Sequence, residues 1–369
     1  MDTTLFMENK QDKSSSSFKL FYYFNSGEYE NYPHFIFYIN TENSGKFLII
    51  NNRRKYEIRD NNTFEVIKKG NLEISPNFDN IKDAILYSKN EIIVCNSYYD
   101  IAYFKLDKNS IISNTILINI DPNVENDIYK DIIDHASLKL LKNKKFAFIA
   151  FLDFRSKIYI LSFSHKYNKI ILETKIKTCS DTVFYEIKTK NIFLISFQLN
   201  KISIVNSNNF KIKKHFDFNL FSMHSTICLI NDNYFLLSEY NSQKEEKLFL
   251  YNLDNFEKVK TFNSKNENIE IFPIKENFFF TSELEGNNEK STIIKIWKFD
   301  EKNKDIILLE SFNFTKFSQK IISGENDFSS LKPIQGSDNL YIINFKHMIN
   351  RIDEIQFLSI FNIINNNLK

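Results

Sequence analysis

Glycine, proline and cysteine are all scarce in this chain of 369 residues, with 6, 5 and 3 copies respectively. The closest two glycines, Gly324 and Gly336, are twelve positions apart. This spacing excludes the glycine-rich phosphate loops and the Gly-x-Ser-x-Gly nucleophile turn, which need closer glycines. The cysteines Cys95, Cys179 and Cys228 form no C-x-x-C pair, which favours a reducing compartment. We therefore expect a cytoplasmic or nuclear protein.

An excess of one charge and long apolar runs are missing as well. The chain has 48 basic and 46 acidic residues, a net charge of +2, so composition gives no general basic field for nucleic acid or an anionic membrane. No stretch approaches the ~18 uncharged apolar residues of a membrane span. The first residues lack the basic and apolar segments of a signal peptide. We expect no membrane span and no nucleic-acid partner.

Motifs for metal binding and catalysis are also missing. The six histidines lie apart, whereas structural zinc needs four closely spaced ligands. The run 121–127 is rich in oxygen ligands but lacks the glycine and spacing of a calcium loop. Asp134, His135 and Asp153 could contribute to a catalytic centre, but they form no recognised motif. We expect no enzymatic activity, no metal, no cofactor and no small-molecule ligand.

Apolar side chains, in contrast, are abundant and recur in a pattern. The chain has 38 Phe and 18 Tyr, and a short apolar element begins near residues 56, 101, 158, 202, 248, 294 and 355. Most successive spacings lie close to the roughly 40–50 residues of a propeller blade. Strands that are apolar on both faces suit sheets packed between neighbouring sheets. The repeat predicts an all-β, seven-bladed β-propeller.

Each repeat can be divided into four strands. In the fourth repeat we expect strands at 182–188, 192–197, 201–205 and 210–216. The turn 206–209 contains only Asn and Ser, which tolerate tight backbone angles without glycine.

The two ends of the chain predict how the ring closes. The last repeat ends after its third strand, near residue 364, and an unassigned strand at 18–24 precedes the first blade. Pairing that N-terminal strand with the last blade would close the ring and remove exposed sheet edges. We expect a disordered tail at 1–16, one propeller at 17–364 and a polar tail at 365–369.

One repeat carries a family resemblance. The segment Ile294-Lys295-Ile296-Trp297 resembles the third strand of a WD40 repeat, and Ser282 resembles the serine of the preceding strand. Lys298 stands at the position of the usual aspartate, and no Gly-His pair precedes any repeat, so the His–Ser–Trp–Asp network of that family is expected to be absent. The resemblance implies a divergent WD40-like propeller that serves as an interaction platform.

One rim of the predicted ring is rich in residues typical of interfaces. Turns between second and third strands lie there with the connections between blades, including 120–134 and 313–329. Tyr and Arg dominate protein interfaces. We predict a non-catalytic protein–protein interaction scaffold, a subunit or adaptor of a larger complex. Other proteins would bind through Arg53, Arg54, Tyr98, Tyr99, Phe154, Arg155, Tyr240 and His347.

Two alternatives stay open. A propeller enzyme or small-molecule binder would gather acids and histidines at the central channel. Phosphoinositide or nucleic-acid binding would use the basic loops 53–55, 142–145 and 211–214, and it requires these clusters to share one face.

Overall fold

The computed structural model consists almost entirely of antiparallel β-strands. It describes residues 18–25, 34–41, 44–74, 78, 80–107, 111–119, 135–152, 155–167, 169–178, 184–198, 201–217, 227–240, 246–264, 267–285, 291–315, 326–337, 340–349 and 353–363. The chain divides into two compact units. Their limits are Met1–Asn31, Phe218–Pro333 and Asn339–Lys369 for one unit, and Tyr32–Asp217 and Ile334–Asp338 for the other.

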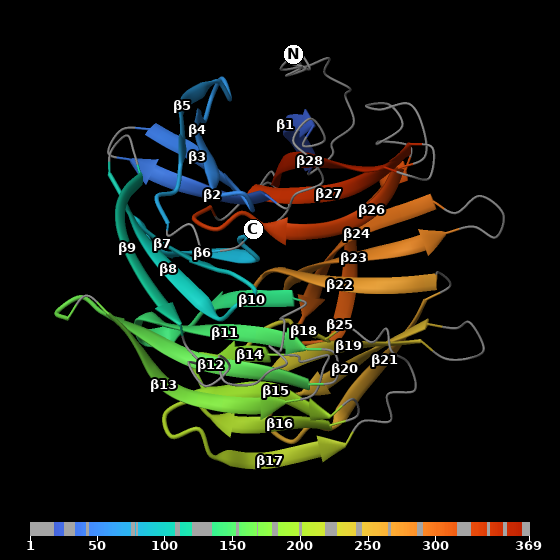
Figure 1. Ribbon diagram of the computed structural model, residues 1–369. Helices are drawn as coiled ribbons and strands as arrows, with labels where there is room; N and C mark the ends of the chain where they lie inside the picture. Colours follow the sequence, from blue (N-terminus) through green and yellow to red (C-terminus); the bar gives the residue numbers. More distant parts are fainter. Residues whose placement is uncertain are drawn as a thin grey trace. The chain divides into compact units, whose positions relative to one another are not determined.

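The unit that begins at Tyr32 contains four four-stranded sheets, which follow one another along the chain (Figure 1). The first sheet consists of β2 (His34–Thr41), β3 (Ser44–Asn51), β4 (Lys55–Asp60) and β5 (Val66–Asn71). The second consists of β6 (Asp83–Ser88), β7 (Glu91–Cys95), β8 (Asp100–Leu106) and β9 (Ile111–Asn119). The third consists of β10 (His135–Leu140), β11 (Lys145–Leu152), β12 (Arg155–Ser164) and β13 (Lys169–Thr178). The fourth consists of β14 (Phe184–Ile187), β15 (Ile192–Gln198), β16 (Lys201–Asn206) and β17 (Ile212–Asp217), close to the predicted strands.

The other unit repeats this plan. The fifth sheet consists of β18 (Ile227–Leu229), β19 (Tyr234–Tyr240), β20 (Glu246–Asn252) and β21 (Lys258–Ser264). The sixth consists of β22 (Glu267–Lys275), β23 (Phe278–Glu285), β24 (Ser291–Asp300) and β25 (Asp305–Asn313). A further sheet has the order β1 (Phe18–Asn25), β28 (Asp353–Ile363), β27 (Leu340–Ile349) and β26 (Asn326–Pro333). The all-β class and the four-stranded repeat are confirmed, whereas a count of seven blades and a closed ring stay predictions.

The core lies between successive sheets. On β11, Phe146 and Phe148 pack with residues of the second sheet, while Ala147 and Ile149 alternate with them and pack with residues of the fourth. The third sheet is therefore apolar on both faces, which is the burial expected of strands that have no solvated side.

A glycine-free turn joins the third and fourth strands in three sheets. The turns 60–64, 206–210 and 252–256 read DNNTF, NSNNF and NLDNF. In each, the first side chain accepts hydrogen bonds from the two N–H groups that lie two and three positions later. The terminal phenylalanines Phe64, Phe210 and Phe256 have φ near +58°, with values of 58°, 57° and 59°. Each packs against a phenylalanine on the second strand of its own sheet (Phe47, Phe193 and Phe235).

The fourth strands share a second feature, a β-bulge. Where Ile58 pairs with Lys68, the next residue Arg59 pairs with Val66, so Ile67 is the extra residue on β5. The other fourth strands also pair with the third strand of their sheet through a register shift at the corresponding position. These strands are β9, β13, β17, β21 and β25. Such bulges bend and twist an edge strand, which makes it a poorer template for further pairing.

Gln335 forms hydrogen bonds to the first strands of two sheets, β2 and β6. The Gln335 carbonyl accepts the N–H of Tyr38 at 2.9 Å, and the Gln335 side chain accepts the N–H of Leu86 at 2.8 Å. The next residue, Gly336, has φ +90°, and a Cβ there would collide with the main-chain carbonyl oxygen of Tyr38. Glycine is therefore required at this position.

Replacing Gly336 tests this contact. We expect Gly336→Ala to lower the free energy of unfolding by about 1–3 kcal/mol, because the backbone is left-handed and the obstructing atom is main chain. Gly45→Ala is the matched control, since its Cβ would meet the side chain of the same Tyr38, at its hydroxyl end, and not main-chain atoms. Urea unfolding compares the two variants, and equal losses would contradict the argument.

The turn aspartates predict a specific acid sensitivity. Main-chain N–H groups of Thr63 and Asn62 lower the pKa of Asp60, and hydrogen bonds from Asn303 lower that of Asp300. A lowered folded-state pKa contributes stability above the unfolded pKa, and this contribution is lost as pH falls through the folded pKa. We expect Asp60→Asn with Asp300→Asn to lose less stability than the natural chain below about pH 4, because Asn keeps the capping oxygen without titrating.

Urea unfolding at a series of pH values measures this difference. Asp232→Asn is the control, because the Asp232 carboxylate makes no hydrogen bond within the described segments. Identical acid profiles for the double variant and the natural chain would show that titration of Asp60 and Asp300 does not contribute to the acid sensitivity.

Candidate partner-binding face

Two neighbouring turns, 51–55 in the first sheet and 96–100 in the second, are built alike. The Asn51 side chain accepts the N–H of Lys55 at 2.9 Å, and the Asn96 side chain accepts that of Asp100 at 2.9 Å. The fourth residue of each turn has a positive φ, 69° at Arg54 and 64° at Tyr99. We call these two segments the paired turns.

The paired turns are joined through the chain that links their sheets. The N–H of Ile81 donates to the Asn52 carbonyl at 2.9 Å, and the next N–H, that of Lys82, donates to the Cys95 carbonyl at 2.8 Å. The N–H of Leu72 donates to the Arg54 carbonyl at 2.7 Å. Consecutive residues of one connection therefore fix both turns at the same end of their sheets.

Each paired turn presents its third residue to solvent and turns its fourth residue inward. Arg53 is exposed and Tyr98 is 39% exposed, whereas Arg54 is half-buried and Tyr99 is only 1% exposed. Tyr99 packs edge-on against Phe148 and Tyr159, with ring centroids 6.0 and 5.8 Å away. The prediction of Tyr99 as a surface residue is wrong, because the left-handed backbone directs its ring into the core.

The other predicted positions are distributed differently. Arg155 is the first residue of β12 and Tyr240 is the last of β19, so both stand where a strand meets the predicted turn. His347 lies within β27, opposite Asn326 and Ile355, rather than in a turn. Phe154 lies outside the described residues. The structure therefore brings Arg53, Arg54, Tyr98 and Tyr99 together, while Tyr240 and His347 belong to the other unit.

Asn52, beside the exposed Arg53, carries a polar atom that sequence reasoning missed. Its side chain is 7% exposed, and its Oδ1 is the one buried side-chain oxygen or nitrogen within the described segments that has no hydrogen-bond partner. Leaving such a group unsatisfied costs about 1–3 kcal/mol. Buried groups of this kind are rare in native proteins, so the Asn52 oxygen is a candidate contact for a bound molecule.

Basic clusters occupy different ends of the sheets. Lys142 and Lys144 lie in the turn between first and second strands, where Tyr87 donates to the Lys144 carbonyl and Glu186 accepts the Lys142 N–H. Arg53 lies in a turn between second and third strands, and in an antiparallel sheet these two kinds of turn fall at opposite ends. The arrangement therefore does not meet the single-face requirement of the lipid or nucleic-acid alternative.

Ser203 and His215 form the contact nearest to a catalytic pair. Ser203 Oγ lies 2.5 Å from His215 Nδ1, and the two residues are direct partners across β16 and β17. Ser203 is fully buried, whereas a nucleophile must reach its substrate. We interpret the pair as a structural hydrogen bond.

Lys139 and Asp83 lie on first strands but link neighbouring sheets. Burial lowers the pKa of Lys139 to about 8, and its Nζ donates to the Phe184 carbonyl at 2.8 Å. Asp83 accepts the N–H of Leu138 at 2.7 Å. No group of three or more His, Cys, Asp or Glu side chains could hold a metal ion in the described part of the chain.

A chain of polar groups crosses the sixth sheet around the single tryptophan. Trp297 Nε1 donates to Thr281 Oγ1 at 2.8 Å, and Thr281 donates to Glu283 at 2.7 Å. Lys295 Nζ pairs with Glu283 at 2.5 Å. Ser282, which resembles the WD40 serine in sequence, follows Thr281 on β23 and therefore lies on the opposite face of that strand. Thr281 is the tryptophan's partner, as the two-residue side-chain period of a strand requires.

Comparison with known proteins agrees with this fold. A solved structure described as the Dos1 propeller matches with a TM-score of 0.53 and 12% identity, over 86% of this chain and 75% of that one. The β-propeller domain of Cps50 (Swd1) from Myceliophteria thermophila matches with a TM-score of 0.50 and 9% identity, over 90% and 98%. No family model and no curated protein matches the sequence. The chain therefore has the fold of a β-propeller.

Across the described segments, no helix combines the length and the apolar character that a membrane crossing requires.

Thr281 and Ser282 offer a direct test of the tryptophan network. We expect Thr281→Val to lower the free energy of unfolding by about 1–3 kcal/mol, because Trp297 and buried Glu283 both lose a partner. Ser282→Ala is expected to cost less, since its hydroxyl makes no hydrogen bond among the described residues. Chemical denaturation of both variants decides, and a larger loss for Ser282→Ala would reverse the assignment.

Proposed function

We propose that this protein is a non-catalytic scaffold, a subunit or adaptor of a larger complex, which binds other proteins through the paired turns. The observation that carries the proposal is the presentation of Arg53 and Tyr98 on two adjacent, hydrogen-bonded turns. Tyr and Arg are enriched among residues that dominate binding energy. A rigid base lowers the entropy that such side chains lose on binding.

Asn52 supports the same face. Asn52 Oδ1 has no hydrogen-bond partner among the described residues, so a donor from a bound partner would satisfy it.

The face is proposed to extend beyond the paired turns. Phe154, Arg155, Tyr240 and His347 would contribute to it if residues 17–364 form one seven-bladed ring closed by β1. The antiparallel pairing of β1 with β28, in which Phe18 lies opposite Ile363, supports that closure. The segments 1–16 and 365–369 would be tails.

A scaffold role in the cytoplasm or nucleus fits the cysteine chemistry. Cys95 and Cys228 are free and buried, and burial raises the pKa of Cys228 to about 12. Both thiols are therefore inert core residues, as expected in a reducing compartment. The burial of Ser203 supports a role without catalysis.

A pulldown of the tagged protein from native lysate, with mass spectrometry, tests the proposal. We expect a stoichiometric set of partners that Arg53→Ala with Tyr98→Ala reduces by about tenfold or more, because both tips contribute contact area. Asn52→Ala should weaken the same partners while leaving stability unchanged or raised.

The matched control places two alanines at the opposite end of the same sheets. Lys89 and Asn62 are exposed there, and Lys89→Ala with Asn62→Ala should retain every partner. Recovery of the protein alone, or equal losses in test and control variants, would overturn the proposed face.

A further inference from the structure

Positive charge is unevenly distributed along this chain. Residues 135–217, which form the third and fourth sheets, contain sixteen basic and five acidic residues, whereas the remaining chain contains 32 basic and 41 acidic residues. In the four strands of the third sheet, Glu173 is the only acidic residue. The third sheet therefore carries a clear excess of positive charge.

Two lysines of the third sheet stand directly opposite each other. Lys157 on β12 is the register partner of Lys177 on β13. Among the strand pairs that the structure describes, this is the one place where two lysine or arginine residues are direct partners. Like charges that face each other across an antiparallel pair lower stability. An anion bound between them would relieve this repulsion.

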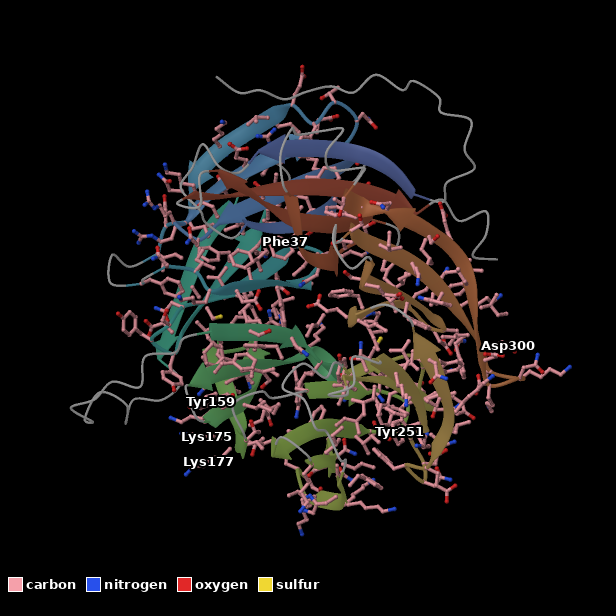
Figure 2. The ribbon with its side chains drawn as sticks, turned by 90° about the vertical axis from the view of Figure 1, so that its right-hand side faces the viewer. Phe37, Tyr159, Lys175, Lys177, Tyr251 and Asp300 are labelled. Atoms are coloured by element: carbon pink, nitrogen blue, oxygen red, sulfur yellow. The ribbon has the colours of Figure 1, made fainter. Side chains whose placement is uncertain are left out.

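Lys175 joins the pair on the same face of the sheet. It precedes Lys177 by two positions, and residues two apart in a strand share a face. Lys175 Nζ lies 5.3 Å from the centroid of the Tyr159 ring, and Lys157 Nζ lies 5.4 Å from that of the Tyr99 ring. Both rings belong to the core between the second and third sheets. We call Lys157, Lys175 and Lys177 the lysine triad, and Figure 2 shows Lys175 and Lys177 beside Tyr159.

The one acidic residue of these strands lies on the other face. Glu173 accepts the Ser162 hydroxyl at 2.7 Å and pairs with Lys145 at 3.4 Å. Ser162 and Lys145 each alternate with a residue of the core shared with the second sheet, Leu161 and Phe146 respectively. They therefore point away from that core. It follows that Glu173 does not neutralise the lysine triad.

Lysines on edge strands also serve to block unwanted strand pairing. This role suits Lys175 and Lys177, which are exposed on the outer strand β13. It does not suit Lys157, because β12 is the third strand of its sheet and Lys157 is only 8% exposed. On the outer strand β5, in contrast, Lys69 is the register partner of Glu57 and pairs with it at 2.9 Å. The lysine triad therefore calls for a further explanation.

The lysine triad lies beside the second of the paired turns. Lys157 Nζ is 3.5 Å from the hydroxyl oxygen of Tyr99, the fourth residue of that turn. The preceding residue, Tyr98, is 39% exposed. A ligand of the lysine triad would thus contact the same face as a partner of Tyr98.

We propose that the lysine triad binds an extended acidic segment of a partner protein, with carboxylates at alternate positions. Same-face residues of a strand are about 6.6 Å apart, so carboxylates two positions apart in an extended segment match the spacing of Lys175 and Lys177. Nucleic acid fits less well, because single strands stack on accessible aromatic rings, and Tyr99 and Tyr159 are 1% and 0% exposed. The proposal rests on the function proposed above, since it names the chemistry of the partner at the second paired turn.

Fluorescence anisotropy with three labelled probes tests the proposal. Two probes are peptides of equal length with four Glu among Ser, placed at every second position in one and at every fourth in the other. The third is an oligouridine RNA of equal charge. We expect the alternating peptide to bind most tightly, with an affinity that falls as salt rises. Lys175→Gln with Lys177→Gln should weaken it about tenfold, because two charge pairs are lost.

Charge reversal at position 177 separates binding from packing. Lys177→Glu places a carboxylate opposite Lys157, so we expect the melting temperature to rise while binding of the alternating peptide is lost. A residue with only a structural role would not change these two measurements in opposite directions. Lys68→Gln with Lys258→Gln removes two charges from other outer strands and should leave peptide binding unchanged. Tyr98→Ala should not affect this probe, which has no apolar side chain, so failure of the lysine triad is distinct from failure of the paired turns.

Four results would overturn the proposal. An oligouridine affinity equal to that of the alternating peptide would assign the lysine triad to nucleic acid. Equal affinities for the two peptides would contradict an extended segment. Equal losses in the Lys68 and Lys258 control would reduce binding to net charge. A lower melting temperature for Lys177→Glu would show that carboxylates of the chain itself already pair with the lysine triad.

Discussion

Burial of both faces of a sheet, as in the second and third sheets, is the constraint on which the rest of this structure depends. On β11, Phe146 and Phe148 enter one core while Ala147 and Ile149 enter the next, so the third sheet has no face that tolerates water. Fully burying one such large side chain contributes about 1.5–3 kcal/mol. A sheet of this kind gains that energy only when another sheet covers each side, which explains why the same unit recurs along the chain. It also leaves only turns and outer strands free to evolve contacts with other molecules.

Scarcity of glycine shapes those turns. Left-handed positions that glycine usually fills are occupied here by Phe64, Phe210 and Phe256, each held by an Asx side chain at the start of the turn. The backbone strain of a non-glycine residue at positive φ is offset because the ring packs on a phenylalanine of the second strand. Gly336 is an exception, since there the main-chain carbonyl of Tyr38 leaves no space for any Cβ. The turns of this chain are thus stabilised partly by core packing of their own phenylalanines.

Strand positions were predictable because they follow from local pattern, whereas site residues depended on backbone geometry. The apolar element at 202–205 lies within β16, and the strand expected at 192–197 is β15 almost to the residue. Positions 98 and 99 are both tyrosine, so the sequence does not distinguish them. The positive φ at Tyr99 directs its ring into the core, whereas the ring of Tyr98 is on the surface. Thr281 could have been recognised from the sequence, because the two-residue strand period places it with Phe279 on the face that holds Trp297. The orphan Asn52 oxygen had no sequence signal, since it is defined by what surrounds it.

The net charge of the whole chain does not reveal its local charge distribution, for a physical reason that also bears on function. Electrostatic forces in salt solution act over about one Debye length, so a partner responds to the charges near its contact and not to a sum over the chain. A total of +2 can therefore contain a region with eleven more basic than acidic residues.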